Sequence, residues 1–478
     1  MPTSLSRKSN GHHTVGGALT SDWWRRQAIT NGKPARHTEP RFGAHWSDYL
    51  VMGLLGLAVF VFVVNVAQRI PDWLLAGRDY FDVWFDGDSP RYLMHMTDRH
   101  SDVRDRSFMH PLLSYAYFPV LAVRMLFHME PYAAVRVFLG LVGTAWVMAM
   151  YALLRLMTLQ RLDATLLVLL GAVSASAMFW FTVPESWALG SLSIVLALIV
   201  VPISQHRRLS VRWYILTSAL TVAISVTNWM LGIIIAFVKF AWRRALWVTL
   251  AAFGAIAFVC VVNAFIFPTF KIAFPEYAHE YIFQAEGGGI FHVFTAFVWH
   301  PIIAPAFRVM SGWDHPNVLC MTFQQMVPGS AGGWGAVAVV LWTVLLALGV
   351  WASTNISAHP MLRRVVGWML LGQFMLHTIY GAEEVFLYSM HWLPCLLVVV
   401  GCVMLTRLRS FALVLTVALI LCAGVNNIRQ LNSAILFAGN EDAIRGRFDA
   451  PRAFDRSVVR SQAVTSPNGA HPKRRDSR

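Results

Sequence analysis

An acidic segment early in the chain carries the side chains best suited to chemistry. Asp82, Asp86 and Asp88 lie within seven residues, and Ser89-Pro90 follows directly. A carboxylate at such a position can act as a general base on a sugar hydroxyl, or bind a metal ion together with its neighbour. Because Pro favours the first position of a helix, the same residues predict a helix start that Asp88 or Ser89 caps. A catalytic carboxylate and a capping Asp are both open interpretations at this point.

Aromatic and basic residues follow the acidic segment. The expected helix continues through Tyr92 and His95, and a second imidazole comes at His110, before Pro111. Guanidinium and imidazole groups near a membrane surface can bind a phosphate. They can equally form a face that is attracted to anionic lipid headgroups. The other basic residues of this segment are Arg91, Arg99, His100, Arg104 and Arg106.

Two further polar residues lie at expected turns between apolar runs. Glu185 sits between Pro184 and Ser186, and Asn228 lies at the tip of a tight helical hairpin. An ionisable residue at the membrane boundary tends to face a cavity or a partner, although it can also reach headgroup water. Asn is in addition a common turn residue. Both are substrate-binding candidates with a structural alternative.

A pair of carboxylates enters the next apolar run near the end of the chain. Glu383 and Glu384 precede Tyr388 and His391. The group is typical of a pocket wall, and we treat all four as substrate-binding candidates. The alternative is an aromatic belt at the membrane interface, which explains Tyr388 better than the paired glutamates.

The segment from Pro268 to Trp334 is long for a connector between membrane helices, and loops of this length are usually functional or disordered. Its triple glycine, 287–289, has no following Lys-Ser/Thr and is interpreted as a hinge that lets the segment close over a substrate. His279-Glu280 and Asp314-His315 lack metal-ligand spacing. A divalent cation is therefore a candidate cofactor without assigned ligands.

The composition indicates that membrane helices position these residues. Of 478 residues, 56% are hydrophobic and only 13% are charged, with a mean hydropathy of +0.53, whereas soluble domains carry about a quarter charged residues. The net charge is +14, and many of the basic residues sit in short pairs between apolar runs, which indicates membrane flanks and not a nucleic-acid surface. Four of the five cysteines lie inside apolar runs and are expected to be small core residues.

Apolar runs of about 20 residues recur along the chain and predict an all-α polytopic membrane protein with about eleven transmembrane helices. The segment from Pro111 to His128 is apolar but short, and it contains Pro119 and Arg124. We expect it to lie at the interface instead of crossing. The expected spans lie near residues 50–67, 133–154, 164–182, 187–203, 213–227, 229–241, 245–266, 333–353, 365–381, 386–405 and 411–426.

If the segment from Pro111 to His128 lies at the interface, the basic pairs all fall on one side of the membrane. The positive-inside rule identifies that side as the cytoplasm. The expected organisation is a cytoplasmic basic tail (1–47), a membrane core (48–427) with outer loops 68–132 and 268–332, and a polar tail (428–478) that is left outside against the rule. The protein is expected in the plasma (inner) membrane with an active site that faces outward. These basic groups are Arg155/Arg161, Arg207/Arg208/Arg212, Arg243/Arg244, Arg363/Arg364 and Arg407/Arg409.

The arrangement resembles the GT-C superfamily of multi-spanning glycosyltransferases, which take a sugar from a polyprenyl-phosphate carrier on the outer face. Its members show one span, an outer loop with an acidic motif and a Tyr, a His/Lys-Pro-Leu-like segment, a short interfacial helix and an Arg that leads into the second span. The elements similar to these are Asp86-Gly87-Asp88-Ser89-Pro90-Arg91-Tyr92, His110-Pro111-Leu112, Leu113–His128, Glu130-Pro131-Tyr132 and Arg136. Where the superfamily commonly has adjacent Asp-Glu, this chain has Asp-Gly-Asp, which leaves the base open between Asp86 and Asp88.

The resemblance implies a glycosyltransferase that moves a hexosyl or pentosyl group, with inversion, from a lipid-linked donor to a glycan, lipid or protein acceptor of the cell envelope. Asp88 or Asp86 would orient or deprotonate the acceptor hydroxyl. The main alternative is a transporter or flippase of lipid-linked or anionic substrates. Transporters often contain internal repeats, and the sequence contains no evident one.

Overall fold

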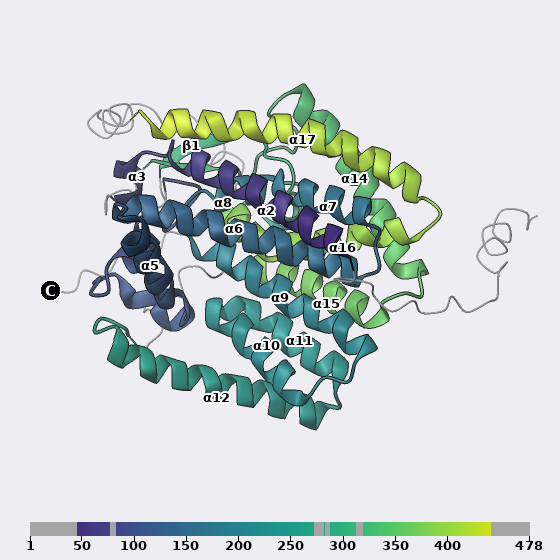
Figure 1. Ribbon diagram of the computed structural model, residues 1–478. Coiled ribbons are helices and arrows are strands. Elements are labelled where there is room, and N and C mark those ends of the chain that lie inside the picture. The colour runs from purple at the N-terminus through teal and green to yellow at the C-terminus, as the bar shows by residue number, and fades with distance from the viewer. Residues whose placement is uncertain (1–44, 77–82, 272–281, 283–286, 312–318, 441–478) are drawn as a thin grey trace, which may run out of the picture. The chain divides into compact units, whose positions relative to one another are not determined.

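The computed structural model describes residues 45–76, 83–271, 282, 287–311 and 319–440, all of which belong to one compact unit, Pro40–Arg478. Apart from one small sheet, the regular structure of these residues is helical (Figure 1). The sheet consists of β1 (Arg308–Ser311) and β2 (Leu319–Thr322), which are antiparallel with Arg308 opposite Thr322. The expectation of an all-α membrane protein is confirmed.

Six described helices are long and apolar enough to cross a membrane. They agree with six of the expected spans. Each carries exposed large apolar side chains, such as Leu54 and Phe258, and such side chains are expected where a helix faces lipid instead of water. The six are α2 (Trp46–Ala67), α6 (Pro131–Leu156), α9 (Ser186–His206), α12 (Trp242–Ile266), α14 (Gly333–Asn355) and α17 (Arg409–Ala438).

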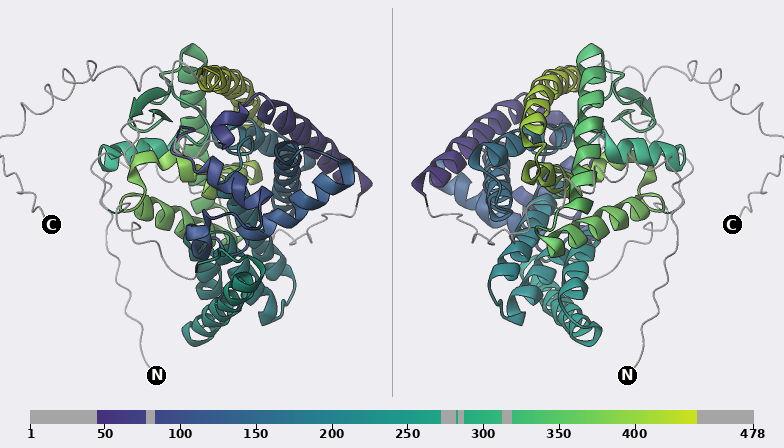
Figure 2. Two further views of the ribbon diagram at one scale, coloured as in Figure 1. Left: turned by 90° about the vertical axis from the view of Figure 1, so that its left-hand side faces the viewer. Right: turned by 90° about the vertical axis from the view of Figure 1, so that its right-hand side faces the viewer.

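The other five expected spans are shorter or broken, so eleven full-length crossings are not confirmed. At 1.5 Å per residue, α10 (Val211–Ile224) and α11 (Trp229–Lys239) reach about 21 Å and 17 Å, short of a ~30 Å core. Both pack with α12 on one side of the bundle (Figure 2). The remaining helical elements of these spans are α7 (Arg161–Ala172), α8 (Ala175–Trp180), η4 (Val226–Asn228), α15 (Pro360–His377), η7 (Ala382–His391), α16 (Leu393–Gly401) and η8 (Cys402–Leu405).

Local chemistry explains the breaks. The helix of α7 ends at Ala172, and Ser174 begins α8 by accepting a hydrogen bond from the Ala177 N–H at 3.3 Å. The last expected span but one is bent by 59° between η7 and α16. Gly381, with φ 62°, precedes this bent pair, and Pro394 starts its second half.

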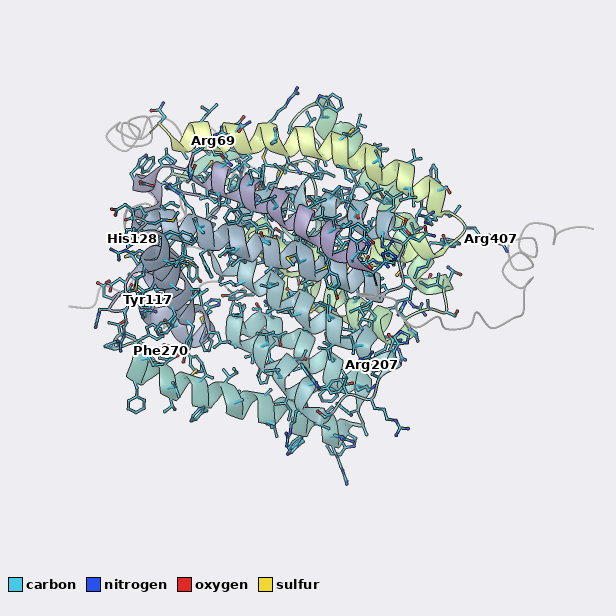
Figure 3. All side chains as sticks on the ribbon, in the orientation of Figure 1. Arg69, Tyr117, His128, Arg207, Phe270 and Arg407 are labelled. Atoms are coloured by element: carbon cyan, nitrogen blue, oxygen red, sulfur yellow. The ribbon has the colours of Figure 1, made fainter. Side chains whose placement is uncertain are left out.

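Charged pairs gather where one set of helix ends meets, which we call the basic end (Asp48, Arg155, Arg161, Asp163 and Arg409). Arg155 and Arg161 each donate to Asp48 at 3.1 Å, which joins the start of α2 to the end of α6. Arg409 donates to both oxygens of Asp163, which joins the starts of α17 and α7. Figure 3 labels Arg207 and Arg407 on this side. Basic pairs from distant segments thus share one end, as expected.

The opposite end, which we call the loop end, holds residues 68–132 and 287–332 as far as they are described, with the turn at Glu185. Arg136 donates to Ile70 O at 3.0 Å, so α6 begins where α2 ends. Figure 3 labels Arg69, His128 and Phe270 on this side. The helical elements here are α3 (Asp72–Ala76), α4 (Ser89–Thr97), η2 (Arg104–Met109), η3 (Leu113–Ala116), α5 (Tyr117–Phe127) and α13 (Ile290–Val298).

Candidate functional site

The acidic motif is held in a conformation that side chains rarely adopt. Phe85 and Asp86 are consecutive non-glycine residues with positive φ, 51° and 61°. Such backbone costs about 1–3 kcal/mol per residue and persists only where its surroundings impose it. Here Phe85 is fully buried, with its ring centroid 4.5 Å from Phe323, 5.2 Å from Phe179 and 5.9 Å from Phe386. An aromatic cluster thus fixes the turn that presents Asp86.

Gly87 brings the acidic motif into contact with Glu185. A Cβ at Gly87 would lie 2.9 Å from Trp84 O and 3.0 Å from Glu185 Oε1. Only a residue without a side chain fits this approach. Glu185 is 1% exposed, and its Oε2 accepts a hydrogen bond from the Ser186 N–H at 3.3 Å at the start of α9. Two carboxylate-bearing segments separated by a hundred residues therefore meet at the loop end.

Asp88 stands at the N-cap position of α4 but does not cap it. Pro90 occupies the first turn, as expected, yet the Asp88 side chain makes no capping hydrogen bond. Its Oδ1 instead lies 3.4 Å from Arg91 Nε, one turn along the helix. The prediction that the Asp88 side chain caps α4 is therefore wrong. The Asp88 and Arg91 side chains are mostly buried, 14% and 12% exposed, and contact each other instead.

The His110 segment packs onto the tip of the short α10–α11 hairpin. His110 Nδ1 donates to Ile224 O at 2.8 Å, and the Leu112 N–H donates to Ala223 O at 2.8 Å. Tyr92 packs edge-on against His110, with ring centroids 6.1 Å apart. His110 and Tyr92, both candidates from the sequence, are thus neighbours beside the hairpin that carries Asn228.

Asn228 and His391 both lie against Gly190. Both side chains are fully buried. A Cβ at Gly190 would lie 2.9 Å from His391 Nε2 and 3.0 Å from Asn228 Nδ2. Neither ring nitrogen of His391 and neither amide atom of Asn228 hydrogen-bonds to a residue that the structure describes.

Aromatic rings border the Asn228–His391 pair. The Trp187 ring lies 4.8 Å from Tyr388 and 5.2 Å from His391, between centroids, and its Nε1 has no hydrogen-bond partner among the described residues. Tyr388 packs in turn on His377 at 4.6 Å. Tyr388 and His391 thus lie together, as the sequence suggested for a pocket wall.

The paired glutamates lie beside the small sheet. Glu384 accepts hydrogen bonds from the Thr322 hydroxyl and, at 3.2 Å, from the Phe323 N–H. These contacts anchor η7 to the end of β2, so Glu384 has a structural role in this arrangement. Glu383 is 4% exposed and interacts electrostatically with Glu384. Val83 O accepts from the Met321 N–H at 3.0 Å, which places the acidic motif beside the same strand.

Of the basic residues in the first loop, Arg104 is a structural residue. It is fully buried, donates to Ser114 Oγ at 2.9 Å and to Asp98 O at 2.8 Å, and lies 4.5 Å above the Phe267 ring. Burial lowers the pKa of Arg104 to about 10. Arg99 donates to Ile266 O at 2.6 Å. Arg91, another member of this group, lies beside the acidic motif.

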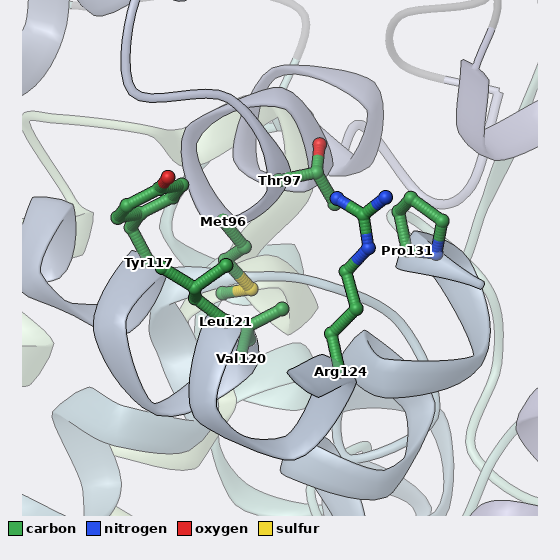
Figure 4. Close-up of a pocket in the computed structure, with 7 residues that line it drawn as sticks. All are labelled: Met96, Thr97, Tyr117, Val120, Leu121, Arg124 and Pro131. Carbon is green, nitrogen blue, oxygen red and sulfur yellow. The ribbon is translucent and has the colours of Figure 1, made fainter. Parts of the chain in front are cut away.

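A small pocket opens elsewhere in the same loop (Figure 4). It lies at the far end of α4 from Asp88, about 12 Å along the helix. It is separate from the polar group around Gly190 and carries no part of the candidate site. Its lining residues are Met96, Thr97, Tyr117, Val120, Leu121, Arg124 and Pro131.

Several candidates fall outside the described residues. These are Asp82, the His279-Glu280 pair and the Asp314-His315 pair. Within the described ranges, no group of three or more His, Cys, Asp or Glu side chains is placed to hold a metal ion. The divalent cation stays a prediction without ligands.

The sequence reasoning missed Trp187, Gly190, Gln373 and His377. Trp187 and Gly190 are three residues apart just after Glu185, so one helix face carries both. This spacing was a readable signal. Gln373 and His377 lie four residues apart on α15 and are fully buried, which their apolar surroundings in the sequence concealed.

No known protein family model matches this chain, and no curated protein matches it.

Proposed function

We propose that this chain is a membrane glycosyltransferase that resembles the GT-C superfamily and transfers a sugar from a polyprenyl-phosphate carrier to an acceptor outside the cytoplasm. The observation that carries the proposal is the acidic motif. Asp86 is held at positive φ, Gly87 touches Glu185, and the Asp88 side chain contacts Arg91 instead of capping α4. Backbone strain of this kind clusters at functional sites.

The reaction needs one base and one stabilised leaving group. The carboxylate of Asp88 or Asp86 takes the proton of the acceptor hydroxyl as its oxygen attacks the anomeric carbon. The bond from that carbon to the phosphate oxygen breaks, and the lipid phosphate leaves with the electron pair. Arg91 and His110 are the cationic and donor groups assigned to that phosphate. These residue roles are also the ones that the resemblance to the GT-C superfamily implies.

We place the loop end outside and the basic end in the cytoplasm. The arginines at the basic end come from short connections, which the positive-inside rule weighs most heavily. The α10–α11 hairpin returns to the end where it began, whether or not it crosses fully. The eleven expected segments therefore keep the same sidedness, with the N-terminal tail in the cytoplasm of a plasma (inner) membrane and α5 along the outer interface.

The test is transfer from a lipid-linked sugar pool in membranes. Asp88→Asn should reduce transfer by about 10²-fold or more, because a general base commonly contributes that much. Folding should be largely intact, because the Asn side chain keeps an oxygen that accepts from Arg91 and no side-chain capping bond is lost. Asp86→Asn at matched protein level separates the two carboxylates. Full activity of Asp88→Asn with loss in Asp86→Asn would move the base by two residues, and full activity in both would remove the proposal.

One observation favours the transporter alternative. The bent pair η7–α16, at 59°, is the kind of broken helix that transporters use around a central substrate site. A flippase would move a lipid-linked sugar across vesicles without consuming it. Translocation by purified protein with no transferred product would establish this alternative.

A further inference from the structure

The short helix α13 has one buried face and one exposed face, and both are apolar. Val293 and Phe297 are buried on one side, whereas Ile290, Phe291 and Phe294 are 66%, 69% and 43% exposed on the other. Contiguous exposed apolar side chains mark a surface that contacts a membrane or a partner. The depth at which α13 lies decides between water, the membrane interface and the hydrocarbon core.

α13 runs beside η7 from the loop end toward the interior of the bundle. Just before its start, Gly287 O accepts from Gln324 Nε2 at 2.8 Å, and a Cβ at Gly287 would lie 2.5 Å from Ala382 O. Near its end, Phe297 O accepts from Trp392 Nε1 at 2.9 Å, and the two rings stack with centroids 4.4 Å apart. Both contacts join positions 95 apart (382 − 287 and 392 − 297), so the two segments run in the same direction.

The inner end of α13 lies deep among the long helices. Trp342 Nε1 donates to Val298 O at 2.8 Å. Trp342 is 13 residues (355 − 342) before the end of α14 at Asn355, which is about 20 Å along the helix. Shortly after that end, His359 hydrogen-bonds to Met157 O, beside the end of α6 at the basic end. In a hydrocarbon core of ~30 Å, Val298 therefore lies about 10 Å below the outer boundary.

The chain after α13 is not helical, yet its backbone polar groups are paired inside the protein. Asn427 Nδ2 donates to Ile302 O at 2.7 Å, and Asn427 Oδ1 accepts from the Ala304 N–H at 2.9 Å. Asn426 Nδ2 donates to Ala304 O at 2.8 Å. Irregular backbone is tolerated at membrane depth where protein groups pair it in this way. This pairing accounts for two costly polar side chains within the apolar helix α17.

The same chain then returns along α17 to the loop end. The Phe307 ring lies 6.3 Å from Phe437, between centroids, one residue before the end of α17. From Asn427 to Phe437 the helix rises about 15 Å. The strand β1 follows directly from Arg308. The chain thus enters and leaves the bundle at the same end.

We propose that α13 and residues 300–307 form a re-entrant hairpin, and that the exposed face of α13 contacts the acyl chains of the outer leaflet. This face is continuous with helices whose own exposed side chains are apolar. The Phe294 ring lies 6.1 Å from Phe374 of α15, between centroids, and Trp299 Nε1 donates to Thr343 Oγ1 of α14 at 2.9 Å. The inference goes beyond the proposed function, because it holds for a transferase and for a transporter.

The test measures the depth of two positions on α13. Ile290→Cys and Phe294→Cys are labelled with bimane in the purified full-length chain, in nanodiscs whose lipids carry a doxyl quencher at a shallow or a deep acyl position. The five native cysteines are buried, so the labelled parent chain supplies the background. Lipid quenchers should reach both positions, and Phe294→Cys should lie about 6 Å deeper than Ile290→Cys, since the two are four residues apart along α13.

Two control positions calibrate the depth. Val337→Cys is on α14, about one turn before the level of Trp342, and its native side chain is 50% exposed; it should match Phe294→Cys. Lys271→Cys, at an exposed position before α13, should react with a membrane-impermeant maleimide and resist quenching.

Three outcomes overturn the inference. Equal depths at Ile290 and Phe294 would make α13 a flat interfacial helix, as expected for α5. Reaction of both positions with the maleimide, without quenching, would place α13 in water. Neither quenching nor reaction would show that a second copy of the chain covers this face.

Discussion

At the basic end, Asp48 accepts hydrogen bonds from Tyr151, Arg155 and Arg161 at 2.9 to 3.1 Å. At the loop end, Asn228 and His391 are just as buried and make no hydrogen bond with the described residues. A paired buried charge holds helices in register, whereas unpaired buried polar groups are costly and suit a site that a ligand completes. The basic end therefore joins helices through paired charges, whereas the loop end contains buried polar groups that a ligand could pair with.

The largest effect should come from breaking the basic end. Asp48→Ala should destabilise the protein by about 3–5 kcal/mol, because it leaves Arg155 and Tyr151 without their buried carboxylate. Thermal unfolding in detergent measures this effect.

The control for this variant is Asp72→Ala, at the loop end. Asp72 pairs with Arg136 at 2.6 Å, but its side chain is 61% exposed. Its removal should cost no more than about 1 kcal/mol. Equal losses from the two variants would contradict the contrast between the ends.

The next effect concerns Glu185, whose loss should affect activity and spare stability. Glu185→Gln keeps an oxygen for the Ser186 N–H and replaces the buried carboxyl group beside Gly87 by an amide. Transfer should fall by about 10²-fold, since the carboxylate adjoins the proposed catalytic motif. The unfolding temperature should stay the same or rise.

Glu130→Gln serves as the matched control for Glu185→Gln. Glu130 is exposed at the start of α6 and makes no capping hydrogen bond. It should behave like the parent protein in both assays. Strong destabilisation by Glu185→Gln with normal specific activity would assign Glu185 to the scaffold.

The smallest effect is a pH dependence of the loop end. His300 is fully buried, and burial lowers its pKa from 6.5 to about 3, although its Nε2 donates to Met326 O at 3.2 Å. Above pH 6.5 neither the folded nor the unfolded chain protonates it, so its contribution to stability is complete. As the pH falls from 6.5 toward 3, only the unfolded state gains the proton, and stability falls by about 1.4 kcal/mol per pH unit.

Unfolding temperatures between pH 7.5 and pH 5 measure the dependence on His300. His300→Gln should flatten the curve over this range, since Gln does not titrate. An unchanged slope in the variant would show that other groups cause the acid sensitivity.

Hydropathy predicted the long spans to within a few residues, as at α2 and α12, because about 20 consecutive apolar residues have few other solutions. It failed for α10 and α11, which are apolar but too short to cross. Hydropathy shows that a segment lies in an apolar environment, but it does not show whether the segment crosses the whole membrane. The Ser174 break and the bend after Gly381 depend on local capping and packing that hydropathy does not register.

Within the site, the sequence predicted which residue types matter, and its local spacing predicted one contact. Asp88 and Arg91 are three apart at a predicted helix start, so their proximity was readable. The sequence could not predict that the Asp88 side chain does not cap α4, because capping and ion pairing are both allowed at that position. The structural role of Glu384 was equally hidden, since its partner Thr322 lies in a separate loop.

The sequence by itself determined that this is a helical membrane protein, that its basic pairs share one end and that its acidic motif begins a helix, because these properties follow from composition and from interactions within a few turns. Only the tertiary structure decided that Gly87 touches Glu185 and that Asn228 and His391 both lie against Gly190. Such contacts join residues that are far apart in the sequence, and their geometry depends on how whole helices pack.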